Sequence, residues 1–245
     1  MQMEIGAMSV TEVEWKGRTG PFMLGLGPGV FSPTHTSRTL ADAIEIEAGD
    51  TVIDVGCGSG VLAFVAARLG AGRVIGCDLS ERAVEAAREN AVRLGLAGVC
   101  EFRQGDLLEP VRDERANVLI GDVSGIPDEI AAATGWFEDV PAGGPTGAEL
   151  PAKFLDSIGD TLVPGGRLYL PTGTIQDERS ILAVARRIFG DRMEAISQRE
   201  FPLPDLVGKS QAVARLMREG LLHLHQRGSR VLWQLRIWRC VRGES

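Results

Sequence analysis

The 245-residue sequence lacks the features of several protein classes, and each absence narrows what the chain can be. No apolar run approaches the roughly 18–20 residues that a membrane-spanning helix needs, so we expect no membrane partner. The first residues show no basic start followed by an apolar core, so we expect no secretion signal. The four cysteines lie far apart without CxxC spacing, which argues against a zinc site or a disulfide framework and predicts a reducing, cytoplasmic location.

An excess of basic residues is also absent. The chain has 26 lysines and arginines against 33 acidic residues, which gives a formal net charge of -7 and a pI of about 5.1. A protein that grips a nucleic-acid backbone normally has a basic surface, because it must neutralise phosphates. The balance therefore predicts no nucleic-acid partner. We interpret the arginine-rich segments 186–192 and 230–242 as solvated faces.

Strand and helix patterns alternate from residue 50 onward, without internal repeats. Such alternation is typical of a parallel sheet that helices cover on both faces. We expect an α/β fold that is Rossmann-like and doubly wound, with a mostly parallel seven-stranded sheet and an antiparallel edge strand. The expected strands are 51–56, 72–78, 98–106, 116–122, 165–171, 193–204 and 229–241, and the expected helices are 59–70, 80–95, 146–162, 177–190 and 211–224.

The segment TVIDVGCGSGVLAF, residues 51–64, places glycines at alternating positions after the first expected strand. The dinucleotide fingerprint Gly-x-Gly-x-x-Gly requires its third glycine one residue later than Gly60, and no Gly-Lys-Ser/Thr follows for a phosphate loop. An acid within the loop, Asp54, would repel phosphates but suits a cation. The loop therefore predicts a ligand with no phosphate and with positive charge near Asp54.

Each of the first four expected strands ends at an aspartate, namely Asp54, Asp78, Asp106 and Asp122. Any one of them alone could be a turn former or a helix cap. However, ligands of open α/β sheets bind at the carboxyl ends of the strands, so four aspartates in register indicate a site. At the end of the second strand, Asp78 can accept hydrogen bonds from both hydroxyls of a ribose. The predicted ligand is a positively charged nucleoside.

Four segments resemble successive motifs of the class I S-adenosylmethionine-dependent methyltransferases: VIDVGCGSG (52–60), IGCDLS (75–80), RQGDLLEP (103–110) and LVPGGRLYL (162–170). The resemblance implies S-adenosyl-L-methionine as the cofactor and S-adenosyl-L-homocysteine as its product. It also implies that the glycine loop takes the methionine part, Asp78 the ribose, and Asp106 with Leu107 the adenine. The implied cofactor-binding residues are Asp54, Gly56, Cys57, Gly58, Gly60, Asp78, Leu79, Gly105, Asp106, Leu107 and Asp122.

Two further segments, residues 29–44 and 143–170, resemble the HemK-type release-factor glutamine methyltransferases. The diagnostic Asn-Pro-Pro-Tyr motif of that family, whose asparagine and proline carbonyls hold a planar nitrogen, is absent. The fourth strand ends instead in IGDVSGIPDE (120–129), which puts Asp122 at the asparagine position. An aspartate could position, or accept a proton from, an amine or a hydroxyl.

Methyl transfer is a direct displacement at the sulfonium methyl group, and it needs a base if the acceptor starts protonated. We predict Asp122 and His35 as the catalytic candidates, and Asp128 and Glu129 are further candidate bases. His35 could instead serve at the start of a helix.

The acceptor is predicted from what surrounds this core. The chain lacks the large N-terminal helical domain expected of a release-factor enzyme, so we expect N- or O-methylation of a small molecule in a biosynthetic pathway. The alternatives are a protein or peptide side chain, a nucleoside-binding module without catalysis, and aminopropyl transfer from the decarboxylated cofactor. The loop at 122–150, with Trp136 and Phe137, could cover the acceptor, and the helical segment at 208–226 could do so or support a homodimer.

We expect a single domain over residues 1–245. In this division, residues 1–48 form a collar that contains a glycine-broken hairpin and a short helix from about Thr36. Residues 49–175 form the cofactor-binding core, and residues 176–245 complete the sheet and carry a helical insertion.

Overall fold

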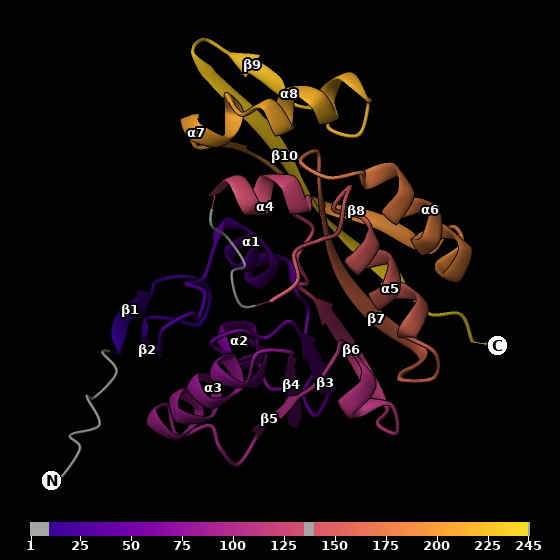
Figure 1. Cartoon of the computed structure of the whole chain (residues 1–245). Coiled ribbons are helices and arrows are strands. Elements are labelled where there is room, and N and C mark those ends of the chain that lie inside the picture. The colour runs from indigo at the N-terminus through magenta and orange to yellow at the C-terminus, as the bar shows by residue number, and fades with distance from the viewer. Residues whose placement is uncertain (1–9, 135–139, 245) are drawn as a thin grey trace, which may run out of the picture.

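The computed structural model describes residues 10–134 and 140–244 of the chain. Their central sheet has the strand order β5-β4-β3-β6-β7-β10-β8, and a short strand, β9, pairs with β10 (Figure 1). The strands are β3 (Thr51–Val55), β4 (Arg73–Asp78), β5 (Cys100–Gln104), β6 (Ala116–Gly121), β7 (Leu162–Gly173), β8 (Met193–Pro202), β9 (His225–Arg227) and β10 (Arg230–Val241).

The five strands from β5 to β7 are parallel, and β10 runs antiparallel to both β7 and β8. This arrangement confirms the predicted α/β fold with its mostly parallel sheet. The antiparallel strand is β10, which lies between β7 and the edge strand β8. The strand order reverses between β3 and β6, and ligands of open α/β sheets bind outside the carboxyl ends of the strands at such a switch point.

Helices cover both faces of the sheet, as its continuously apolar strands require (Figure 1). Along β3 the side chains alternate: Val52 packs on one face, whereas Ile53 and Val55 pack on the other. The first face is covered by α1 (His35–Ala43), α2 (Val61–Arg68) and α3 (Glu81–Arg93), together with the hairpin of β1 (Thr11–Trp15) and β2 (Phe22–Leu26). The second face is covered by α5 (Glu149–Ser157) and α6 (Glu178–Phe189).

Local capping explains where several helices begin and end. The Ser80 side chain accepts a hydrogen bond from the backbone N–H of Ala83 and so serves as the N-cap of α3. Pro151 stands in the first turn of α5, where its missing N–H costs no helical hydrogen bond. The helix expected at 211–224 is shorter than predicted: α8 (Gln211–Arg218) ends before Gly220, whose positive φ of 72° turns the chain toward β9.

A third hydrophobic cluster joins α4 (Asp128–Thr134), α7 (Asp205–Gly208) and α8, which Figure 1 shows grouped at one end of the molecule. Trp136 and Phe137, the predicted acceptor cover, lie outside the described residues. Within residues 10–134 and 140–244, none of the helices has the length and apolar character required to span a bilayer.

Candidate active site

A cavity of about 720 Å³ opens at the carboxyl ends of the parallel strands. Its walls come from the loops that follow β3, β4, β5, β6 and β7, from the segment before α1, and from β10. Eight predicted site residues line it: Gly56, Cys57, Gly58, Asp78, Leu79, Asp106, Leu107 and Asp122. The structure thus brings together most of the residues that the sequence motifs implied.

The glycine loop after β3 has one side packed and one side open. Gly56 has a φ of +77°, and a Cβ atom there would lie 2.6 Å from the backbone oxygen of Asp122, so only glycine lets the two loops touch. Gly58 has a φ of +52°, and a Cβ atom there would meet nothing within 4 Å. The loop therefore presents bare backbone to open space in the cavity, which leaves room for a ligand.

Asp54 does not line the cavity, contrary to the expectation that it contacts the ligand directly. It shares the face of β3 that α2 covers, and its Oδ2 accepts a hydrogen bond of 3.1 Å from the N–H of Ala63. The side chain is fully buried, and its Oδ1 has no hydrogen-bond partner within the described residues. Burial, and then the charge of Asp122, hold the pKa of Asp54 well above its usual range.

Gly60 is also absent from the cavity wall. It is the N-cap residue of α2, with a φ of +88°, and a Cβ atom there would lie 2.6 Å from the ring of Phe64. A glycine is therefore needed at position 60 because the Phe64 ring packs against the backbone there.

Asp78 organises the neighbouring wall. Its Oδ2 accepts from the N–H of Gly58 and its Oδ1 from the N–H of Ser80, both at 2.9 Å. One carboxylate thus fastens the glycine loop and the start of α3 while it faces the cavity. Burial raises the pKa of Asp78, although these N–H groups act in the opposite direction.

The next part of the cavity suits a flat, largely apolar group. Leu79 lines it with 45% of its surface exposed, so its apolar side chain is accessible to a ligand. Leu107 lines it from the loop after β5 with a positive φ of 52°. Beside them, Asp106 forms an ion pair with Lys153 of α5, with Oδ2 and Nζ 2.5 Å apart. The sequence motifs did not identify Lys153, because only the docking of α5 brings it to this wall.

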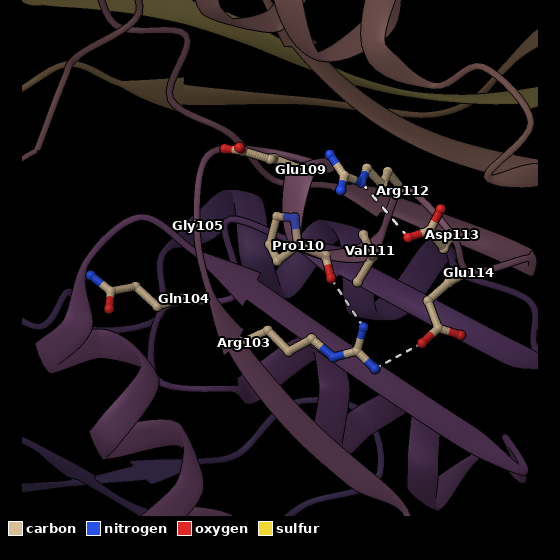
Figure 2. Close-up of a pocket in the computed structure, with 9 residues that line it drawn as sticks. All are labelled: Arg103, Gln104, Gly105, Glu109, Pro110, Val111, Arg112, Asp113 and Glu114. Atoms are coloured by element: carbon tan, nitrogen blue, oxygen red, sulfur yellow. Dashed lines mark hydrogen bonds and ion pairs between the residues drawn. The ribbon is translucent and has the colours of Figure 1, made fainter.

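Gly105 lies in a different hollow, of about 480 Å³, beside the helical turn Glu109–Val111 (Figure 2). A Cβ atom on Gly105 would lie 2.9 Å from the ring of Pro110, so glycine allows this proline to pack. The prediction that Gly105 contacts the cofactor therefore lacks a geometric basis, since the residue does not line the larger cavity.

Charges in this second hollow neutralise one another. Arg103 donates to the carbonyl of Pro110 at 3.0 Å and pairs with Glu114 at 2.7 Å, and Figure 2 shows it pointing between them. Glu114 also pairs with Arg73 at 2.7 Å, and both arginines contact Glu101. Hydrogen bonds from Arg73 and Arg103 lower the pKa of Glu114 to about 2. The hollow is thus a surface depression over a closed ionic network.

We expect Glu114→Gln to lower the free energy of unfolding at pH 7 by about 1–2 kcal/mol, because Arg73 and Arg103 lose one of their two shared carboxylate partners and solvent screens only part of the interaction. A folded-state pKa below the unfolded value of 4.5 stabilises the protein above pH 4.5, and this contribution disappears as the pH falls to about 2. Urea unfolding of both proteins at pH 7 and pH 3 tests this expectation. Glu109→Gln, at an exposed position of the same hollow, is the matched control. Equal losses at both pH values would contradict the electrostatic cause.

Asp122 follows β6 and is partly buried in the cavity wall. Its Oδ2 accepts a hydrogen bond of 3.3 Å from the hydroxyl of Ser37 in α1. Burial raises the pKa of Asp122 to about 6, and the Ser37 hydroxyl only partly opposes this shift. The contact between its backbone and Gly56 places Asp122 directly beside the glycine loop.

The other candidate bases lie elsewhere. His35 begins α1 outside the cavity lining, and its ring stacks on Phe201 with the ring centroids 4.5 Å apart. Asp128 accepts from the N–H of Gly144, and Glu129 forms an ion pair with Arg215. Of the four candidates, Asp122 alone lines the cavity. Ser37, in the same first turn of α1, lines the cavity, whereas His35 points to another side of the helix. The sequence alone does not show which side of this turn faces the cavity.

Several lining residues had no signal in the sequence motifs. Phe31 precedes α1, Gln176 follows β7, and Trp233 and Leu235 belong to β10. All four line the cavity, and Trp233 and Leu235 reach it because β10 pairs with β7.

Comparison with known proteins identifies the family. A methyltransferase-domain family model matches residues 46–211. The release factor glutamine methyltransferase of Moorella thermoacetica is 32% identical over 205 residues, which cover 78% of this chain and 69% of that protein. The chain belongs to the class I S-adenosylmethionine-dependent methyltransferases. This methyltransferase is also 33% identical over 182 residues to the ribosomal protein L11 methyltransferase of Pelotomaculum thermopropionicum, which covers 72% of the chain but only 51% of that protein.

Solved structures share the fold of this methyltransferase. The 16S rRNA N2 G1207 methyltransferase of Thermus thermophilus, in complex with the cofactor and guanosine, has a TM-score of 0.60 at 16% identity. The similarity covers 95% of this chain and 50% of that one. The tRNA m1G37 methyltransferase of Methanocaldococcus jannaschii has a TM-score of 0.59 at 14% identity, over 96% of this chain and 55% of that one. S-adenosyl-L-methionine is the cofactor of this family, and the open backbone at Gly58 and the uncovered Leu79 fit it.

Two predictions from the sequence are wrong in the light of these relatives. Their names specify ribosomal protein L11, a release factor, tRNA and rRNA, which contradicts the expected small-molecule acceptor. The same names contradict the expectation that excluded a nucleic-acid partner. Net charge is a property of the whole chain, whereas an acceptor needs only local access to the cavity. Net charge therefore could not decide what reaches the site.

Proposed function

We propose that this methyltransferase transfers the methyl group of S-adenosylmethionine to an amine nitrogen of a protein. The observation that carries the proposal is Asp122, which lines the cavity: its backbone oxygen lies against Gly56 of the glycine loop, and its carboxyl group accepts from Ser37. The relatives named for ribosomal protein L11 and for a release factor support a protein acceptor. The carboxyl group at the asparagine position of the HemK-type motif favours an amine over a neutral amide.

The electrostatic role of Asp122 follows from the movement of positive charge during methyl transfer. Bound S-adenosylmethionine supplies the sulfonium methyl group, and positive charge passes to the acceptor nitrogen as the methyl group is transferred. An ionised carboxylate beside that nitrogen stabilises the developing charge and also attracts an ammonium group during binding. With its pKa raised to about 6, Asp122 is mostly ionised at neutral pH yet is a better proton acceptor than an ordinary aspartate.

We infer the cofactor contacts from the same cavity. The backbone at Gly56 and Gly58 would hold the methionine part, and Asp78 would accept from the ribose hydroxyls. Leu79 and Leu107 would enclose the adenine. Asp54 would act behind the loop. Burial, and then the charges of Asp122 and Asp78, raise the pKa of Asp54, and a cationic ligand would favour its ionised form.

We also infer that the chain acts as one domain in the cytoplasm. The family model covers the whole predicted core of residues 49–175, and all four cysteines are buried free thiols, as in a reducing compartment. The collar of residues 1–48 supports this reading through Ser37, which reaches Asp122 in the core.

Methyl transfer to purified macromolecules tests the proposal. The probes are bacterial ribosomal protein L11, a bacterial release factor, total tRNA and ribosomal RNA, each incubated with enzyme and radiolabelled S-adenosylmethionine. We expect label in a protein, which peptide mass spectrometry locates at a lysine or an amino terminus. Label at a glutamine amide would overturn the amine assignment, and label confined to RNA would overturn the protein acceptor.

A further inference from the structure

Gln176 occupies a position in the acceptor part of the cavity that the cofactor contacts do not use. It lies in the loop after β7, lines the cavity and is only 6% exposed. Two glycines make room for it: a Cβ atom on Gly125 would lie 2.0 Å from Gln176 Oε1, and one on Gly147 would lie 3.0 Å from Gln176 Cβ. Three loops therefore converge on this side chain and hold it beside the segment that begins at Asp122.

The side-chain amide of Gln176 is unpaired among the described residues, although its backbone N–H donates to the carbonyl of Gly173 at 3.2 Å. The neighbouring threonines differ. The hydroxyl of Thr172 donates to Glu178 and accepts from the indole of Trp238, and the hydroxyl of Thr174 accepts from the N–H of Gln234. A primary amide has two donors and one acceptor, and the Gln176 amide is not among the fully buried side-chain groups without a partner, so it is accessible from the cavity. A ligand that displaces water from this amide must therefore offer it matching hydrogen-bond partners.

We propose that Gln176 recognises a peptide group of the acceptor, next to the residue that is methylated. This inference rests on the proposed protein amine methylation and names what the site recognises besides the amine. A neutral amide pairs well with another amide, because each supplies a donor and an acceptor. Asp122 supplies the charged partner in the same cavity, and Trp233 and Leu235 provide an apolar wall. A carboxylate that binds an amine and an amide that binds a peptide group together fit an amine attached to a peptide backbone.

Two amine probes of different structure test the role of Gln176. Ala-Lys-Ala-amide offers both kinds of amine beside peptide groups, whereas hexylamine offers an amine without any. We expect Gln176→Leu to lower kcat/KM for the peptide by about 5- to 30-fold, mainly through KM, because a hydrogen bond of about 1–2 kcal/mol is lost. The value for hexylamine should change less than twofold. Gln211→Leu, at an exposed glutamine that begins α8, is the matched control and should leave both values unchanged.

The outcomes separate this inference from the function on which it rests. If the wild-type enzyme methylates neither amine, amine methylation fails and the inference fails with it. If the wild type methylates the peptide but Gln176→Leu leaves both probes unchanged, or lowers both equally, only the recognition of the peptide group is overturned. Titration calorimetry with S-adenosylhomocysteine shows whether the variant remains folded, because its affinity should match that of the wild type.

Discussion

Asp78→Ala is expected to lower the affinity for S-adenosylmethionine by about 30- to 1,000-fold. The carboxylate would accept from the ribose hydroxyls, and hydrogen bonds to a charged group contribute about 1.5–3 kcal/mol each. The same carboxylate holds the N–H groups of Gly58 and Ser80, both at 2.9 Å. Its removal therefore takes away a ligand contact and also loosens the loop that presents the methionine part. Titration calorimetry with the cofactor and with S-adenosylhomocysteine measures the loss.

Two further variants show which part of the effect belongs to the ribose. Asp78→Asn keeps one oxygen for a backbone N–H group but loses the charge, so its affinity should lie between those of the wild type and the alanine variant. Asp113→Ala changes an exposed aspartate whose nearest cation, Arg112, lies 3.7 Å away, and it should leave the affinity unchanged. Wild-type affinity in Asp78→Ala would remove Asp78 from the cofactor site and would challenge the whole assignment of this cavity.

The parts of the site that could be predicted from the sequence depend on local chain geometry. A parallel strand followed by a glycine loop and a helix places Gly56 and Gly58 at the carboxyl edge of the sheet in any protein of this fold. Asp78 follows from the same reasoning on the neighbouring strand. The confirmed strand alternation also depends on local patterns of apolar residues, which is why the fold class could be predicted well.

The rest depends on how distant segments pack. Asp54 was expected at the ligand because it ends a strand, yet its side chain points to the face that α2 covers. Gly105 was also expected at the ligand because it lies near the end of a strand, but it lines the second hollow. Lys153, Gln176 and Trp233 reach the cavity from α5, the loop after β7 and β10, and no spacing in the sequence links them to the glycine loop.

Asp122→Asn is expected to lower methyl transfer by about 100-fold or more while the cofactor affinity changes little. The amide keeps the shape of the side chain and a hydrogen bond with Ser37, but it cannot carry the charge that stabilises the acceptor nitrogen or accept its proton. Loss of turnover with retained cofactor binding would place Asp122 at the acceptor. Unchanged turnover with an amine probe would remove it from the reaction.

The same substitution should stabilise the protein without bound cofactor. The folded-state pKa of about 6 exceeds the ordinary value of 3.8, so the ionised side chain destabilises the fold at neutral pH by at most about 3 kcal/mol. Because the folded state holds this proton more tightly, wild-type stability falls as the pH rises from about 4 to 6. The advantage of Asp122→Asn should therefore be full above pH 6 and absent below pH 4 in urea unfolding.

The pH profile of methyl transfer completes this prediction. Wild-type activity should decline on the acid side, as Asp122 takes up a proton and loses its charge; its pKa of about 6 applies to the cofactor-free protein, and the positive charge of bound cofactor moves the decline to lower pH. The residual activity of Asp122→Asn should lack that decline. Asp191→Asn, at an exposed aspartate, should keep both the wild-type profile and the wild-type stability. A gain in stability together with a loss of turnover is what a carboxylate retained for chemistry at the expense of the fold would produce. A variant that loses both would show instead that Asp122 is structural.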